Sequence, residues 1–336
     1  MEATLHFLAK LPSASLNSLA PSRPLPDTSL DGLAEPLWTS SSSVRMPWPA
    51  DVAVASDGRV YVRDVEQARI TTLDAEGTII GGWGSPGSGE GQFEFEDDTD
   101  PHAASFGGMA ILDDEIFVAD KRRVQRFDLD GKLLGAWGSR GRKPGQILKA
   151  QHMAAGPDGN IFIVDTVLKR VQAFAPGGKL VAGWPIPVKD VRYPSVICVT
   201  STGEVIVADE RGEVLAGEPG VVIYKFSSGG KLLTSWGEPD DGQGDLDAGE
   251  FAGTTGCACS TDGRVYISED SSNRIQAFDF DGKFLFSFGG APGAEPNGAV
   301  ALSGDSLVVT DGDAGNVSKF RLTQEKGAKR FGERST

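Results

Sequence analysis

The sequence predicts an all-β protein, a six-bladed β-propeller built from four-stranded antiparallel blades. The main observation is an internal repeat, in which a bulky apolar residue is followed four residues later by glycine and ten residues later by an aromatic residue. The five copies are Leu73/Gly77/Trp83, Phe127/Gly131/Trp137, Phe174/Gly178/Trp184, Phe226/Gly230/Trp236 and Phe278/Gly282/Phe288. Their final aromatic residues lie 54, 47, 52 and 52 residues apart, a period typical of propeller blades.

Each repeat has the pattern of four short strands. In the first repeat, the Asp57-Gly58 pair predicts a hairpin turn, because both residues tolerate a positive φ. The segment after it alternates apolar and polar residues, which is the period of a half-buried strand. The four strands are expected at residues 51–55, 59–64, 69–74 and 78–83. Four antiparallel strands in about 50 residues make one propeller blade.

Six such repeats are expected, and the sixth is incomplete. The repeats begin near Asp51, Gly108, His152, Val196, Gly256 and Gly298. The sixth has three clear strands, at residues 299–302, 306–310 and 317–322. Its fourth strand could come from residues 328–332, or from an N-terminal strand at 4–11 or 35–39. One of them has to close the ring, because an open blade leaves an unpaired strand edge.

The pattern resembles the NHL-repeat family of six-bladed propellers over about residues 48–322. The matching segments are Asp-Gly-Arg-Val-Tyr-Val-Arg-Asp (57–64), Trp-Gly-Ser-Pro-Gly-Ser-Gly-Glu-Gly-Gln-Phe (83–93) and Asp-Ser-Ser-Asn-Arg-Ile-Gln-Ala-Phe (270–278). The resemblance implies an NHL-like propeller at residues 47–334, preceded by an N-terminal strap at residues 1–46. Members of this family include RNA-binding modules, protein scaffolds, sensor domains and a lyase that cleaves peptidyl-hydroxyglycine, so the fold alone does not name a function.

Composition narrows the classes of partner. The net charge of −15 argues against nucleic acid, whose phosphates would be repelled. The sequence contains no run of 18 apolar residues, so no membrane span is predicted. The first eleven residues lack the basic start and long apolar core of a secretory signal, which favours a cytoplasmic protein. Organellar targeting and a signal already removed stay open as alternatives.

The cysteines also favour an intracellular setting. Cys198, Cys257 and Cys259 all fall in expected inner strands. An odd number of buried cysteines predicts reduced thiols. Cys257 and Cys259 share one strand face two residues apart, a spacing that does not allow an unstrained disulfide in an extended strand.

Ligands of propellers usually bind where the inner strands begin, because six strand starts converge on one axis there. His152 opens the inner strand of the third repeat, and Asp51 opens that of the first. The lyase branch of the resembling family holds a metal through histidines at this position in three blades, and His152 matches one of the three. His152 and Asp51 could hold a divalent metal such as Zn or Ca, or act as a base and its orienting group, facing each other across the channel. Alternatively, His152 makes a hydrogen bond to the backbone.

A second set of acidic residues ends the second strand of every repeat. They are Asp64, Asp120, Asp165, Asp209, Glu269 and Asp311. Such a ring could bind a cation. The favoured interpretation is that each acid accepts hydrogen bonds from its own turn, because a residue present in every repeat usually serves the repeat.

Two acidic insertions, at residues 94–102 and 238–250, are expected on the face where the inner strands begin. Long loops on a rigid scaffold commonly carry binding. In the first insertion His102 lies among acidic residues that include Asp98 and Asp100, a set that could bind a metal or a cationic partner. Arg140 and Arg142, in the loop before the third repeat, have the opposite charge and could pair with these acids. The alternative is a solvated acidic loop.

Two functions are therefore expected from the sequence. The first is a binding scaffold whose channel-mouth face and acidic loops hold a protein partner or a small ligand. The second is a lyase or hydrolase with a site around His152 and Asp51, with His102 as a further candidate. A deep mouth with convergent polar groups would favour the enzyme, and a shallow mouth filled by apolar side chains would favour the scaffold.

Overall fold

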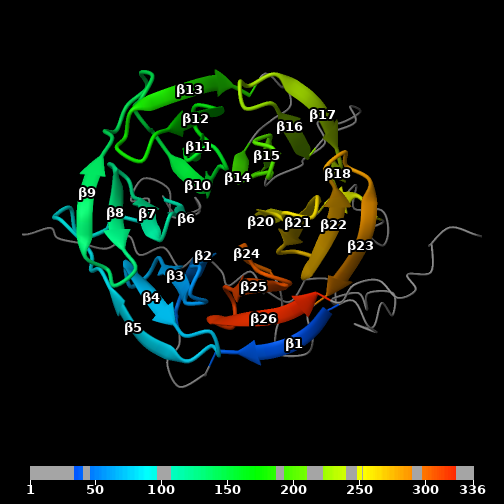
Figure 1. Ribbon diagram of the computed structural model, residues 1–336, viewed down its shortest axis with the longest axis horizontal. Coiled ribbons are helices and arrows are strands. Elements are labelled where there is room, and N and C mark those ends of the chain that lie inside the picture. The colour runs from blue at the N-terminus through cyan, green and yellow to red at the C-terminus, as the bar shows by residue number, and fades with distance from the viewer. Residues whose placement is uncertain are drawn as a thin grey trace, which may run out of the picture.

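The computed structural model confirms the all-β six-bladed propeller (Figure 1). The structure describes residues 34–40, 46–96, 107–186, 193–209, 222–239, 248–251, 253–289 and 297–322. Within these ranges, six four-stranded antiparallel sheets are arranged around a central axis. The same residues contain no helix long and apolar enough to cross a membrane.

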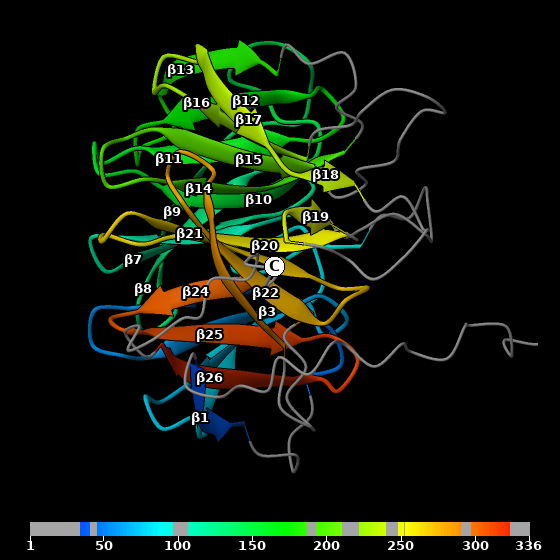
Figure 2. The ribbon, with the colours of Figure 1, turned by 90° about the vertical axis from the view of Figure 1, so that its right-hand side faces the viewer.

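Every blade except the sixth is formed by four consecutive strands, numbered from the axis outward. Blade one has β2 (Pro49–Val54), β3 (Val60–Asp64), β4 (Arg69–Leu73) and β5 (Ile79–Trp83). Blade two has β6 (Met109–Leu112), β7 (Glu115–Ala119), β8 (Val124–Asp128) and β9 (Leu133–Trp137). Blade three has β10 (Ala150–Ala155), β11 (Ile161–Asp165), β12 (Arg170–Phe174) and β13 (Leu180–Pro185). Blade four has β14 (Pro194–Val199), β15 (Val205–Asp209), β16 (Ile223–Phe226) and β17 (Leu232–Trp236). Blade five has β20 (Thr254–Cys259), β21 (Arg264–Glu269), β22 (Arg274–Asp279) and β23 (Phe284–Gly289). A short parallel pair, β18 (Glu238–Pro239) and β19 (Glu250–Phe251), connects blades four and five (Figure 2).

The sixth blade is closed by the N-terminal part of the chain. It contains β24 (Val300–Ser303), β25 (Ser306–Asp311) and β26 (Asn316–Leu322), and its outermost strand is β1 (Ala34–Thr39). The pairing of β1 with β26 is antiparallel, with Thr39 opposite Ser318. Of the three expected closing segments, the structure therefore selects residues 35–39. Residues 4–11 and 328–332 lie outside the described residues, and the expected division of the chain at residue 46 stays a prediction.

The packing of a tryptophan side chain against a glycine joins neighbouring blades, and it explains the sequence repeat. The tryptophan at the end of an outer strand covers the glycine of the outer hairpin in the next blade, so closely that a Cβ on that glycine would lie under 3 Å from the indole. These glycines also have a positive φ, which disfavours other residues. The pairs are Trp38–Gly77, Trp83–Gly131, Trp137–Gly178, Trp184–Gly230 and Trp236–Gly282. Trp38 belongs to β1, so the strand that closes the ring also supplies the tryptophan of the sixth blade.

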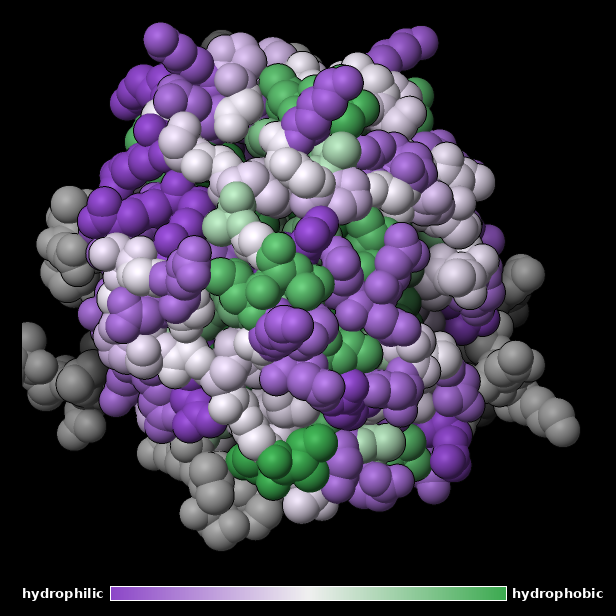
Figure 3. Space-filling model, turned by 60° about the vertical axis from the view of Figure 1, so that its left-hand side comes forward, coloured by the Kyte–Doolittle hydropathy of each residue, from purple (hydrophilic) through white to green (hydrophobic). Residues whose placement is uncertain are grey.

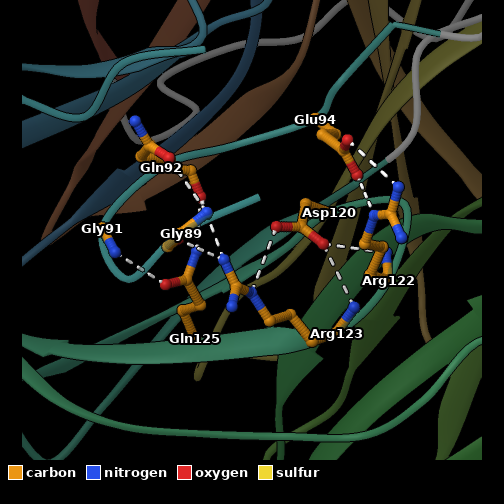
Figure 4. Close-up of polar contacts among 8 residues, drawn as sticks. All are labelled: Gly89, Gly91, Gln92, Glu94, Asp120, Arg122, Arg123 and Gln125. Carbon is orange, nitrogen blue, oxygen red and sulfur yellow. Dashed lines mark hydrogen bonds and ion pairs between the residues drawn. The ribbon is translucent and has the colours of Figure 1, made fainter. Parts of the chain in front are cut away.

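A second contact between blades fixes the loops that connect them. In three blades a buried glutamine on the third strand forms hydrogen bonds to the backbone of the loop arriving from the preceding blade. Figure 4 shows this contact in blade two. In blade two, Gln125 accepts the N–H of Gly91 at 2.9 Å and donates to the carbonyl oxygen of Gln92 at 2.8 Å. Arg123 donates to the carbonyl of Gly89 in the same loop. The equivalent glutamines in blades three and five are Gln172 and Gln276.

Burial follows the position of each strand in its blade. The second strands β3, β11 and β15 are buried along their whole length, because sheet faces of neighbouring blades cover both sides. The outermost strands are half exposed, and several carry exposed apolar side chains, including Ile80, Leu134 and Val181. Figure 3 brings forward the left-hand side of the view in Figure 1, and on that face the apolar patches are separated by polar residues.

The prediction of three reduced cysteines is wrong. The structure joins Cys198 to Cys259 in a disulfide, and only Cys257 is free. The partners lie 61 residues apart on the inner strands of two neighbouring blades. Spacing in the sequence relates only cysteines on the same strand, whereas Cys198 and Cys259 come together because neighbouring blades pack side by side.

Ring closure can be tested at Gly77. In Gly77→Ala, the new methyl group would lie 2.4 Å from the Trp38 indole, on a residue with φ +83°. We expect the free energy of unfolding to fall by about 1–3 kcal/mol, because a non-glycine residue at positive φ is strained and the indole of the closing strand must move. Urea unfolding followed by tryptophan fluorescence measures the change.

Gly81→Ala is the matched control in the same blade. A Cβ at Gly81 meets no atom within 4 Å. The two variants should therefore differ clearly in unfolding free energy. Equal stability would mean that the Trp38–Gly77 contact does not hold the ring closed.

Candidate functional site

A cavity of about 450 Å³ lies at the mouth of the central channel, where the inner strands begin. Blades one, three, four, five and six all contribute to its lining. The polar residues of the lining include Arg63, Gln151, His152, Ser195, Asp270 and Asp313. This volume lies within the range of about 300–1,000 Å³ usual for small-molecule sites.

Four of the lining residues are extra residues inserted at the start of an inner strand. In β10, for example, Ala150 pairs with Asp165 and His152 pairs with Val164, so Gln151 has no opposite residue. Such a β-bulge bends the strand and re-aims a side chain. The four residues are Ala50, Gln151, Ser195 and Thr255, and all of them line the cavity. Counting from strand ends finds His152 but misses its neighbour, because only the pairing register shows the inserted residue.

His152 and Asp51 contact each other directly rather than facing each other across the channel. The Nε2 atom of His152 lies 3.4 Å from Oδ1 of Asp51, and Nδ1 lies 3.2 Å from the carbonyl oxygen of Ile197. Asp51 is buried, and its carboxylate also accepts the N–H groups of Val52 at 2.8 Å and Met109 at 2.7 Å. This network links the inner strands of blades one to four at the edge of the cavity.

Both ring nitrogens of His152 lie near oxygen atoms, Nε2 near the Asp51 carboxylate and Nδ1 near the Ile197 carbonyl. The backbone contact is the alternative expected for His152 from the sequence, and the structure contains it. The catalytic and metal-binding roles of His152 and Asp51 stay hypotheses.

Arg63 places a buried positive charge beside this pair. Its side chain is buried, and its guanidinium lies 5.0 Å above the ring of Phe95. Burial lowers the pKa of Arg63, while the nearby carboxylates of Asp51 and Asp64 act in the opposite direction. The cavity lining therefore combines a cation with the acids Asp270 and Asp313.

Two polar atoms on the bulge residues of the lining have no hydrogen-bond partner among the described residues. They are the hydroxyl oxygen of Ser195, a residue only 3% exposed, and Oε1 of Gln151. Buried polar atoms nearly always have a partner, and leaving one without costs about 1–3 kcal/mol. Both residues are bulge residues that line the cavity, and the two atoms themselves are buried.

Four of the acids that end the second strands accept a backbone N–H of their own turn: Asp64, Asp120, Asp165 and Asp311. Asp209 instead accepts the N–H of Tyr193, and Glu269 accepts from the side chains of Arg274 and Gln276. Asp64 accepts the N–H of Gln67, and Asp120 accepts the N–H groups of Arg122 and Arg123. Burial raises the pKa of Asp64 and Asp120, and these backbone hydrogen bonds partly offset that effect. The contacts of the four acids agree with the favoured interpretation that each acid stabilises its repeat.

The loop residues expected to bind a partner are only partly described. Asp98, Asp100 and His102 lie outside the described residues. Arg140 and Arg142 are exposed in the loop before blade three, where the Arg142 carbonyl accepts a hydrogen bond from Arg170 at 3.2 Å. Neither arginine lines the cavity. Their pairing with the acidic loop stays a prediction.

The residues described at the mouth fit a metal only in part. His152 and Asp51 offer two ligand atoms, whereas zinc in proteins usually takes three or four. Among the described residues, the one set of three metal-type ligands is Cys198, Cys257 and Cys259, away from the cavity lining. A divalent metal at His152 therefore stays a hypothesis that needs a further ligand.

Comparison with known proteins supports the fold and leaves the activity open. No protein-family profile and no curated protein matches the chain. A streptogramin B lyase structure is similar over 86% of this chain and 97% of its own, with 15% identity and a TM-score of 0.56. A gluconolactonase from Xanthomonas campestris is similar over 89% of this chain and 94% of its own, with 16% identity and a TM-score of 0.55. The Swd1 β-propeller domain from Myceliophteria thermophila is similar over 86% of this chain and 100% of its own, with 11% identity and a TM-score of 0.54.

These similarities show a propeller fold that is shared by a lyase, a gluconolactonase and the Swd1 propeller domain. At such low identity they show the fold alone. They do not confirm the NHL family or its lyase branch.

The His152–Asp51 network can be tested with Asp51→Asn. The amide replaces one carboxylate oxygen by an NH₂ group, so an acceptor for a buried N–H is lost and the contact to His152 changes. We expect the free energy of unfolding to fall by about 1–3 kcal/mol. Chemical unfolding measures the loss.

Asp128→Asn is the control, because it changes the same group in a hairpin turn where one oxygen accepts both backbone N–H groups. An asparagine keeps that acceptor, so we expect a change within about 0.5 kcal/mol. If Asp51→Asn were as stable as the control, the network would not stabilise the ring.

Proposed function

We propose that this propeller binds a small, neutral, polar molecule at its channel mouth. The observation that carries the proposal is a cavity of ligand size whose lining combines polar side chains from five blades, among them the bulge residues Ser195 and Gln151. The Gln151 amide and the Ser195 hydroxyl can each donate and accept hydrogen bonds. A molecule rich in hydroxyl or amide groups matches such a lining.

The lining charges support a neutral ligand over an ionic one. Arg63 and the acids Asp270 and Asp313 lie around the same cavity, so a strongly charged molecule would meet repulsion from one of the two signs. The alternative of a protein partner, held by the acidic loops at residues 94–102 and 238–250, stays a hypothesis that the cavity does not favour.

Binding can be tested with a panel of neutral sugars, sugar lactones and short cyclic peptides. We expect at least one compound to raise the Tm of the wild-type protein, because a ligand that binds only the folded state stabilises it. Calorimetry should then show about tenfold weaker binding in Ser195→Ala and in Gln151→Ala, the loss of about one hydrogen bond each.

Ser201→Ala is the control, since Ser201 is exposed in the hairpin after β14 and does not line the cavity. Its affinity should equal that of the wild type. Ligand affinity unchanged in both cavity variants would refute binding at this site.

A second candidate is catalysis in the same cavity, as a lyase or hydrolase. The observation in its favour is that His152 lines the cavity and is held in place through both ring nitrogens. The similar solved structures include a gluconolactonase and a virginiamycin B lyase from Staphylococcus aureus crystallised as a catalytically inactive histidine-to-alanine variant. The identity to both is at most 16%, so they suggest which reactions to try first.

Turnover should be assayed with lactones and cyclic lactone peptides. If His152 acts as a general acid or base, His152→Ala should lower the rate about 10²- to 10⁴-fold while binding persists. Elemental analysis of both proteins checks the metal hypothesis, because a metal bound by His152 would be lost in the variant. Equal rates in the two proteins would remove His152 from the reaction.

A further inference from the structure

Three cysteines meet between the inner strands of blades four and five. Cys198 lies on β14, while Cys257 and Cys259 lie on the same face of β20. Their sulfur atoms all lie within 4.8 Å of one another. Cys198 is bonded to Cys259, and the Cys257 sulfur lies 2.7 Å from that of Cys198. The free thiol is thus next to a sulfur of the disulfide.

The surroundings favour redox chemistry over metal binding. Cys198 and Cys257 belong to an apolar core cluster that includes Val196, Ile206 and Ile267. Burial raises the pKa of the Cys257 thiol, so it is neutral near pH 7. A disulfide and a neutral thiol carry no charge, whereas three thiolates around a mono- or divalent cation would bury net negative charge in this apolar cluster.

We propose that these cysteines form a redox-active site in which Cys198 forms a disulfide with either Cys257 or Cys259. In the exchange, the Cys257 sulfur loses its proton and attacks Sγ of Cys198. The Cys198–Cys257 bond forms as the Cys198–Cys259 bond breaks, and the Cys259 sulfur leaves with the electron pair and takes up a proton. The number of disulfides is unchanged, so the exchange needs no external oxidant.

The exchange moves the free thiol between two different environments. Cys257 is 3% exposed, and Cys259 is partly exposed at the end of β20. A free thiol at Cys259 can exchange with small disulfides of the glutathione class and release one small thiol, whereas one at Cys257 is shielded. Cys198 thus keeps blades four and five cross-linked in either state, and the exchange controls whether the protein presents a reactive thiol. This proposal does not depend on ligand binding in the cavity.

Disulfide mapping of the full-length protein tests the proposal. The protein is incubated with oxidised glutathione at pH 8.5, quenched with acid, denatured and alkylated, and the labelled cysteine is located by fragmentation in a mass spectrometer. We expect one intramolecular disulfide per wild-type molecule, with the third cysteine being Cys257 in part of the molecules and Cys259 in the rest, and carrying either the alkyl label or a glutathione adduct.

The single variants separate exchange from a fixed disulfide. Cys259→Ser should form Cys198–Cys257 to the same extent as the wild type forms its disulfide. Cys257→Ser should form Cys198–Cys259 alone, and Cys198→Ser should form no intramolecular disulfide. Circular dichroism checks that each variant is folded.

Three results would overturn the proposal. One is a wild-type label found on Cys257 alone after prolonged incubation, together with two free thiols in Cys259→Ser. Another is three free thiols in the wild type after the same treatment. The third is stoichiometric zinc that is lost in each of the three variants, which would make the cluster a metal site.

Discussion

The propeller depends on one repeated contact, the packing of a tryptophan against a glycine of the next blade. Because the glycine has no Cβ and a positive φ, the outer hairpin can approach the indole closely enough to leave no gap between blades. The contact recurs between five pairs of blades, including the pair closed by Trp38 and Gly77. Between blades five and six, Phe288 packs against Phe320 instead, with ring centroids 6.3 Å apart. The glutamines that hold the connecting loops add a polar contact to the same interfaces.

Once the blades are fixed in this way, the strand starts can vary without loss of the fold. Bulges in four inner strands turn Ala50, Gln151, Ser195 and Thr255 toward the channel mouth. The repeat therefore supplies the frame, and the inserted residues supply the chemistry of the cavity. His152 and Asp51 contribute to both the frame and the cavity, because they line or border the cavity while joining four inner strands through polar contacts.

The repeated part of the structure is predictable from the sequence because its signal lies in local spacing. The Leu/Phe, Gly and Trp positions identify five blades, and the acids at strand ends identify turns. The cavity is less predictable, because a bulge depends on which residues pair across strands. Residue counting alone therefore finds His152 but not Ser195. The disulfide is hidden for a related reason, since Cys198 and Cys259 become neighbours only after two blades have packed together.

Closure by β1 has a consequence for how the chain folds. Thr39 pairs with Ser318, so the first and last strands of blade six are separated by almost the whole propeller sequence. At ribosomal rates of about 5–20 residues per second, β1 emerges on the order of tens of seconds before its partner. During that time the edge of β1 has no native partner from β26, a state prone to mispairing. Contacts so distant in sequence also make the final step slow, so the last strand to be synthesised determines when the ring becomes a single cooperative unit.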